Sequence, residues 1–218
     1  NVLIDGFTIT RDGNTVATWN NSGLNSAGVA IQGQTYTNAE IRNSKFIGNR
    51  TGIDINNSNG HTIRNNIIDN NRTGMIFRNQ TDNLTVTGNF ISNNWTVGIL
   101  FLDGSNGSNS PVQSALNSKF NGNVISGNWY GQVVDRQTGG SLPLPGNNLK
   151  NFVSNWWGTT TPVVSTASST EPGYSDQIPV LYGGTAVAPG GQPDILGTAS
   201  ANIVYNPVMG ADLDEIAS

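Results

Sequence analysis

The chain has 218 residues, of which 35% are apolar and 11% are charged, with a net charge of −4 and no cysteine. This composition supplies one core but excludes a disulfide framework and a thiolate metal site. Without a Lys/Arg run or a long apolar run, we expect neither a nucleic-acid partner nor a membrane span.

From residue 4 onward, apolar residues recur in pairs five positions apart. Successive pairs begin 37, 22, 23, 34 and 32 residues after one another, so insertions interrupt a unit of about 22 residues. The pairs are Ile4/Ile9, Ile41/Phe46, Ile63/Ile68, Val86/Ile91, Phe120/Ile125 and Phe152/Trp157. Short strands with one apolar face cannot close a core alone, but stacked coils bury a continuous one. The pattern predicts an all-β protein, a right-handed parallel β-helix of about six coils.

Two polar columns accompany these pairs, three and eight residues after the first member of each. The first column is Phe7, Ser44, Asn66, Asn89, Asn123 and Asn155, and the second is Asp12, Asn49, Asn71, Asn94, Asn128 and Thr160. Asparagine tolerates the left-handed backbone conformation of tight corners, and its amide both donates and accepts hydrogen bonds. We therefore predict stacked asparagines at two corners of the coil.

In most units a glycine and a short apolar strand follow the second column. The outward side chains of this strand are expected to be Ala30, Asp54, Ile76, Leu100 and Val133 on successive coils. The last three would form an apolar strip. Residues 159–201 or another subunit would cover this strip.

Three Gly-, Ser- or Pro-rich insertions, at about 12–26, 103–114 and 138–147, are predicted to be surface loops. We expect coils over residues 1–158, with Trp157 plugging the end of the core, and an irregular C-terminal cap over residues 159–218. Residues 1–10 already follow the repeat pattern of a coil. We therefore expect the N-terminus to be truncated within a β-helix that continues in a larger parent polypeptide.

The units TIRNNIIDNNRTGMIF and TVTGNFISNNWTVGILF resemble the repeats of the pectin-lyase-like superfamily, in particular NosD-like and carbohydrate-binding β-helix regions of secreted bacterial proteins. The segment NFVSNWWG at 151–158 strengthens the resemblance. It implies a right-handed parallel β-helix and an extracellular or cell-surface location in a bacterium. It does not select an activity, because such repeats serve lyases, glycosidases, adhesins and surface-layer proteins alike.

Candidates for catalysis are few. A hydrolytic member would cluster two or three aspartates, and a lyase would need carboxylate-bound calcium with an Arg or Lys base. The candidates are Asp54, Asp135 and Arg78, and no two carboxylates share a register on adjacent coils. His61, the single histidine, is expected in a surface loop.

Calcium is the one cofactor that the sequence suggests. The loop DGSNGSN offers oxygen ligands from Asp103, Ser105 and Asn109. It contains one carboxylate, so we expect a flexible loop without metal, with calcium as the alternative, and no other cofactor.

One column suggests ligand binding. It lies one residue past the second asparagine column and consists of Arg50, Arg72, Trp95 and Trp129, with Tyr130 beside it. Sugar rings stack on aromatic faces, and the planar guanidinium of arginine can donate two parallel hydrogen bonds to a carboxylate or sulfate group. The alternative is that the tryptophans only cover a corner of the coil.

Three functions follow as hypotheses. The first is a noncatalytic structural or adhesive module of a secreted or cell-surface protein, which contacts a polysaccharide, a cell-surface glycan or neighbouring subunits along a lateral face. The second is a polysaccharide lyase or glycoside hydrolase, and the third is a self-assembling surface-layer or filament component. The missing carboxylate cluster and the Arg/Trp column favour the first.

Overall fold

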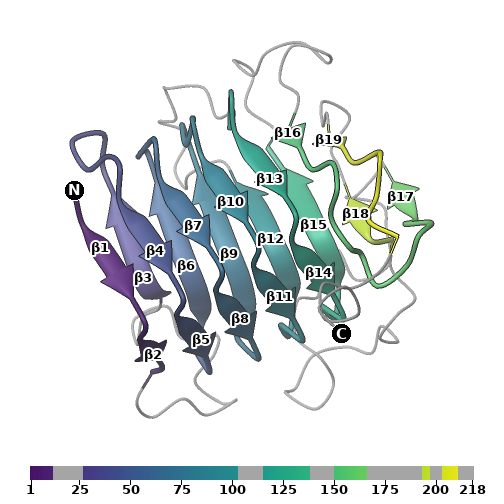
Figure 1. Cartoon of the computed structure of the whole chain (residues 1–218), viewed down its shortest axis with the longest axis horizontal. Coiled ribbons are helices and arrows are strands. Elements are labelled where there is room, and N and C mark those ends of the chain that lie inside the picture. Colours follow the sequence, from purple (N-terminus) through teal and green to yellow (C-terminus); the bar gives the residue numbers. More distant parts are fainter. Residues whose placement is uncertain (12–26, 103–114, 138–149, 166–192, 197–202, 211–218) are drawn as a thin grey trace.

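The computed structural model describes residues 1–11, 27–102, 115–137, 150–165, 193–196 and 203–210. The three predicted insertions therefore lie outside the described residues. Short strands stack into coils along one axis, with the first coil at one end and the C-terminal strands at the other (Figure 1). All strand pairs within the described residues are parallel, as a β-helix requires.

The strands form three sheets, which we name A, B and C in the order in which the chain enters them. Sheet A contains β1 (Leu3–Asp5), β4 (Glu40–Arg42), β7 (Thr62–Arg64), β10 (Thr85–Thr87), β13 (Lys119–Asn121), β16 (Lys150–Asn151) and β19 (Ile203–Val204). Sheet B contains β2 (Thr8–Ile9), β5 (Lys45–Ile47), β8 (Ile67–Asp69), β11 (Phe90–Ser92) and β14 (Val124–Ser126). Sheet C contains β3 (Ala27–Gln32), β6 (Thr51–Asn56), β9 (Thr73–Arg78), β12 (Val97–Leu102), β15 (Gly131–Arg136), β18 (Ile195–Leu196) and β17 (Val164–Ser165).

Five coils each contribute one strand to every sheet. A sixth coil begins with β16 and continues as an isolated bridge between Trp156 and Val124. The predicted apolar pairs lie on sheets A and B and face the interior, where those of the second to fifth coils are fully buried. Burying each such side chain is worth about 1.5–3 kcal/mol, so these columns hold the coils together.

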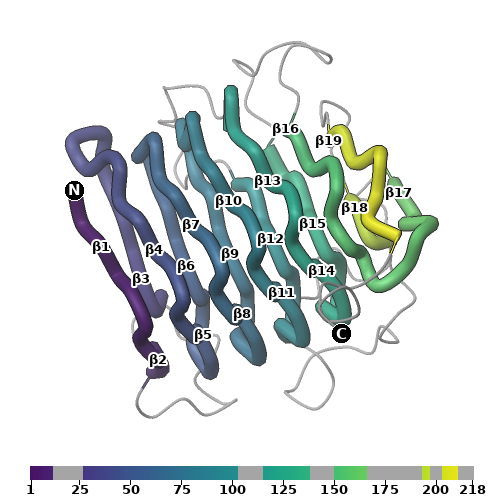
Figure 2. Tube along the Cα trace, in the orientation of Figure 1, coloured from purple at the N-terminus to yellow at the C-terminus, as the bar shows by residue number. Residues whose placement is uncertain are grey.

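Aromatic rings fill the core toward the C-terminal end. Phe120 and Phe152 stack with ring centroids 4.4 Å apart, and Trp157 lies 6.2 Å beyond Phe152. Trp157 is 2% exposed, which confirms that it belongs to the inward column. β19 pairs with β16, and β17 and β18 extend sheet C beyond β15, so these strands follow the last coils (Figure 2).

Both asparagine ladders are present. Where asparagines follow one another on adjacent coils, the Oδ1 atom of the later residue accepts from the backbone N–H and the Nδ2 group of the earlier one. For Asn66 and Asn89 both distances are 3.0 Å, and Asn66 Nδ2 also donates to the carbonyl of Ile41 at 3.0 Å. The ladders are Ser44, Asn66, Asn89, Asn123, Asn155 and Asn49, Asn71, Asn94, Asn128.

The left-handed backbone conformation belongs to different residues from those that form the ladders. It occurs at the residue just before a ladder position, as in Asn65, Asn70 and Asn93, with φ of 54°, 53° and 52°. Glycine takes this place before Asn89 and Asn123. The frequent Asn-Asn doublets therefore combine two tasks: the first residue makes the turn and the second bonds to the neighbouring coils.

The ends of the ladders differ from the prediction. Phe7 contributes only its backbone N–H, which donates to Ser44 Oγ at 3.1 Å, and its ring is exposed. Thr160 is exposed and takes no part. Instead Gln132, four residues beyond Asn128, accepts from the backbone N–H and Nδ2 of Asn128 at 3.2 and 2.7 Å. The predicted position Asp12 lies outside the described residues.

Candidate ligand-binding face

The outer face of sheet C carries one side chain per coil in a continuous column. The strand register places Ala30, Asp54, Ile76 and Leu100 in line, as predicted, but the fifth member is Val134 and not Val133. Val133 is buried in the core beside Ile99. The fourth and fifth coils contain one extra residue between the ladder asparagine and the strand, which shifts the register.

The apolar part of this column is covered. Ile76, Leu100 and Val134 form a second cluster with Val97, Tyr130 and Leu196, and Leu102 and Trp129 pack against it. Tyr130 is fully buried within this cluster, so its predicted place on an exposed binding strip is wrong. Its large ring fills the outer cluster, which removes more apolar surface from water than an exposed position would.

The polar part of the face forms a hollow of about 320 Å³ across β3, β6 and β9. Two small residues, Ala27 and Ala30, leave the space, and longer polar side chains surround it. The remaining lining residues are Gln32, Arg50, Thr51, Asp54, Asn56 and Arg78. The hollow therefore brings Asp54, Arg78 and Arg50 together.

Asp54 and Arg78 form a bidentate ion pair. Arg78 Nε donates to Asp54 Oδ1 at 3.0 Å, and Arg78 Nη2 lies 2.8 Å from Oδ2. The Asp54 side chain is 10% exposed. This burial raises the pKa of Asp54, although the Arg78 charge and hydrogen bonds oppose the shift.

Two further arginines give the face an excess of positive charge. Burial, together with Arg78 and Arg11, lowers the pKa of Arg50, although Asp54 opposes the shift. Burial and the charges of Arg50 and Arg136 lower the pKa of Arg72 to about 10.

Arg72 stands out among these cations. Its Nε group is buried and has no hydrogen-bond partner among the described residues, where it also forms no salt bridge. A buried donor without an acceptor costs about 1–3 kcal/mol. The Arg72 side chain as a whole is partly exposed beside Arg50, where an anion would reduce the repulsion between the two cations.

The predicted Arg/Trp column exists as a row on four successive coils. Thr73 N–H donates to the Arg50 carbonyl at 3.1 Å, which places Arg72 beside Arg50. Trp95 and Trp129 follow on the next two coils. All four side chains are partly exposed, and the Trp95 Nε1–H donates to Asn70 Oδ1. Contact with sugar at this row stays a prediction.

Asp135 lies elsewhere. It occupies the same register as Phe101, points into the coil, and is 1% exposed. Its Oδ2 atom lies 2.9 Å from Lys150 Nζ. Asp135 is thus buried and separate from the hollow that contains Asp54 and Arg78, the two other catalytic candidates.

His61 is also buried, and its predicted place in a surface loop is wrong. Its Nδ1 atom accepts the Ala39 N–H at 3.2 Å, and its Nε2 atom lies 2.7 Å from Ser58 Oγ. Because Nδ1 uses its lone pair as an acceptor, the proton of the neutral ring is assigned to Nε2. The ring therefore donates to Ser58 and cannot remove its proton, and burial lowers the pKa of His61.

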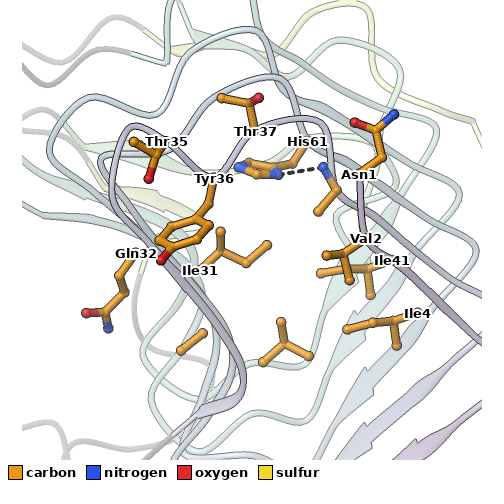
Figure 3. Close-up of a pocket in the computed structure, with 13 residues that line it drawn as sticks. Asn1, Val2, Ile4, Ile31, Gln32, Thr35, Tyr36, Thr37, Ile41 and His61 are labelled. Atoms are coloured by element: carbon orange, nitrogen blue, oxygen red, sulfur yellow. Dashed lines mark hydrogen bonds between the residues drawn. The ribbon is translucent and has the colours of Figure 1, made fainter.

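A larger pocket of about 620 Å³ opens at the N-terminal end of the core. Figure 3 shows Ile4 and Ile41 on one side, and Ile31 and Tyr36 on the other. Its lining contains no Asp, Glu, Lys or Arg. The pocket continues the apolar interior of the coil, and none of the candidates Asp54, Asp135 and Arg78 lines it.

The calcium candidates Asp103, Ser105 and Asn109 lie outside the described residues. Within the described part of the chain, no three His, Asp or Glu residues come close enough together to hold a metal ion. A search of the same residues for an apolar helix long enough to cross a membrane found none.

Comparison with known proteins agrees with the fold. A family model described as the right-handed beta helix region matches residues 5–155. No curated protein and no solved structure shows a significant match. The three parallel sheets and the family match together fit the pectin-lyase-like superfamily. The chain belongs to the right-handed parallel β-helix family.

Proposed function

We propose that the chain is a noncatalytic β-helix module that binds acidic glycans, at the cell surface or outside the cell, through the outer face of sheet C. The observation that carries this proposal is the hollow in which Arg50 and Arg78 face a single carboxylate, Asp54, with Arg72 beside them. In a chain with a net charge of −4, three of the ten Lys and Arg residues lie together here.

The chemistry of the cations favours carboxylate or sulfate groups. A guanidinium donates two parallel hydrogen bonds to either group, and each charge-assisted bond is worth about 1.5–3 kcal/mol. Arg72 lies partly exposed beside Arg50, so an anion held there would reduce the repulsion between the two cations. Neighbouring coils lie about 4.8 Å apart, so a sugar held at Arg72 is within reach of the Trp95 ring.

Catalysis has less support. Glycoside hydrolysis uses two carboxyl groups roughly 5–9.5 Å apart, and the hollow is lined by one, which Arg78 already binds. Elimination by a lyase is the second candidate, because the lowered pKa of Arg72 is the direction that a base requires. With a pKa of about 10, however, only about one Arg72 in a thousand is neutral at pH 7.

The test compares two ligands that differ only in charge. Titration calorimetry with oligogalacturonate and with its methyl ester, at low and high salt, separates carboxylate recognition from contact with the sugar backbone. A sulfated glycan provides the second anion. We expect binding of the anionic probes that weakens with salt, and weak or no binding of the ester. Equal affinity for the acid and the ester would overturn the proposal.

Three variants locate the site. Arg72→Gln should weaken binding about tenfold, which corresponds to about 1.4 kcal/mol. Ala30→Leu should block the hollow while leaving every charge in place. The matched control is Arg64→Gln, because Arg64 lies on sheet A and pairs with Glu40. Unsaturated or shortened products in the same mixtures would favour the lyase or the hydrolase instead.

A further inference from the structure

Three polar side chains meet inside the core where β15 ends and β16 begins. Asp135, Gln137 and Lys150 are each 1% exposed. Lys150 Nζ lies 2.9 Å from Asp135 Oδ2 and donates to Gln137 Oε1 at 2.8 Å. The amine also lies 5.1 Å from the centroid of the Phe101 ring, so one wall of the cluster is apolar.

An ion pair in this place contributes little to stability by itself. In the preceding coil, Phe101 occupies the position equivalent to Asp135. Well-packed apolar side chains are often as stable as a buried ion pair, because removing two charges from water costs several kcal/mol per ion. The cluster therefore calls for an explanation other than packing.

The geometry holds the amine of Lys150 against both an amide and a carboxylate. The amine nitrogen is within hydrogen-bond distance of both the amide oxygen of Gln137 and a carboxylate that can take its proton. The carboxylate is fixed in turn, because Asp135 Oδ1 accepts the backbone N–H of Gln137 at 3.0 Å. An amine, a carboxylate and an amide carbon thus meet where the end of β15 faces the start of β16 inside the coil.

We propose that Lys150 and Gln137 join in an amide cross-link, with Asp135 as the base that promotes it. Asp135 takes a proton from the Lys150 ammonium, and the neutral Nζ attacks the Gln137 Cδ atom. The new N–C bond forms, Asp135 passes the first proton to Nε2, and the bond from Cδ to Nε2 breaks to release ammonia. The attacking nitrogen loses a second proton through Asp135 to this ammonia, which departs as ammonium. An ammonium and a primary amide thereby become a secondary amide and an ammonium ion, and no oxidant or cofactor is consumed.

The surroundings favour this reaction. Transfer of the proton from lysine to aspartate removes two charges from an apolar environment, which lowers their desolvation cost. Burial also keeps out water, which would otherwise compete for the Gln137 carbonyl. The product would covalently tie the end of β15 to the start of β16. A chain without cysteine has no disulfide to do this.

Mass spectrometry of the full chain tests the proposal directly. The purified protein should be lighter than its sequence by one ammonia. Trypsin should cleave after Arg136 but not after Lys150, and because no Lys or Arg follows, residues 137–218 should remain one fragment. Cleavage after Lys119 serves as the control in the same digest.

Three outcomes would overturn the proposal. An unchanged mass with cleavage after Lys150 shows that no link forms. Loss of water in place of ammonia assigns the link to Asp135 and not to Gln137. Loss of ammonia with normal cleavage after Lys150 assigns it to a succinimide, which Asn-Gly pairs such as Asn121-Gly122 can form.

Two variants separate the roles of the residues. Asp135→Asn keeps the shape but removes the base, so we expect the full sequence mass and cleavage after Lys150. Gln137→Met removes the acceptor and retains a side chain of similar length, so it should give the same result if the first variant does not fold. A cross-link that persists in Asp135→Asn would exclude Asp135 as the base.

Discussion

Replacing Asn89 by leucine tests how much the buried ladders contribute to stability. Asn89 is in the middle of the first ladder and fully buried. Its Oδ1 atom accepts the backbone N–H and the Nδ2 group of Asn66, both at 3.0 Å. Its Nδ2 group donates to the carbonyls of Ile63 and Thr87 and to Asn123 Oδ1. Leucine has nearly the same size but can make none of these bonds.

The expected cost follows from the groups left without a partner. The substitution leaves the Asn66 backbone N–H and one Nδ2 hydrogen of Asn66 without their acceptor, and each orphaned buried donor costs about 1–3 kcal/mol. Leucine recovers at most about 1.5–3 kcal/mol through burial of its apolar surface. We expect a net loss of about 2 kcal/mol, which lowers the Tm of a chain of this length by roughly 4–8 °C.

Thermal and urea unfolding, followed by tryptophan fluorescence, measure the effect. The matched control is Thr85→Leu, which places the same side chain on an exposed position of β10 in the same coil. Substitutions at such surface positions usually change stability by less than about 0.5 kcal/mol. If Asn89→Leu and Thr85→Leu have the same midpoint, the ladder bonds do not stabilise the coil as argued.

Three further predictions use separate features. Burial lowers the pKa of His61, so its contribution to the free energy of unfolding should be fully present above about pH 6.5 and fall at lower pH by up to about 1.4 kcal/mol per pH unit. His61→Gln should remove this pH dependence in urea titrations, and a dependence that persists in the variant would contradict the prediction. Gly98→Ala should destabilise the fold by about 1–3 kcal/mol, because the added Cβ would lie 2.6 Å from the Gln132 carbonyl oxygen. The control Gly210→Ala should not, because no heavy atom lies within 4 Å of a Cβ at that position. Asp54→Asn should strengthen oligogalacturonate binding about fivefold by freeing Arg78 from its ion pair, and weaker binding would show that Asp54 contacts the ligand.

The sequence predicts the interior well because each interior position repeats at a fixed offset. The offset of five between Ile63 and Ile68 survives in every coil, and so do the ladder positions Asn66 and Asn71. Insertions between coils do not disturb these offsets, because within each coil the number of residues from sheet A to sheet B stays the same. Periodicity in an asparagine-rich chain with few charged residues thus suffices to identify the stacked fold.

The register of sheet C was harder to predict. The stretch from the ladder asparagine to the strand varies by one residue, and glycine stands at the corner in some coils but not in the fifth, where Gln132 takes its place. Alignment on glycine therefore put Val133 outside and left Tyr130 on the surface. A one-residue slip exchanges inward and outward side chains, so a small error in counting changed the expected face.

His61 and Lys150 show a signal that sequence analysis missed. Both stand two residues before the first member of an apolar pair, in a column that also contains Ala39, Leu84 and Ser118. All five are buried. The local sequence NSNGHT around His61 is typical of a loop, but the column position decides burial, because the side chain enters the coil just before sheet A begins.

The candidate site lies at outward positions of the coils, where the fold does not determine the residue type. Inside sheet C, the second to fourth coils place apolar side chains at equivalent positions, because the stacked core requires them. On the outside the column changes from Ala30 and Asp54 to Ile76 and Leu100, since stacking sets no requirement on residues that face outward. The polar hollow lies where that column is small and charged, and the covered cluster begins where it becomes apolar. The repeats that identify the fold therefore carry no information about the ligand, which depends on the outward residues of two or three coils.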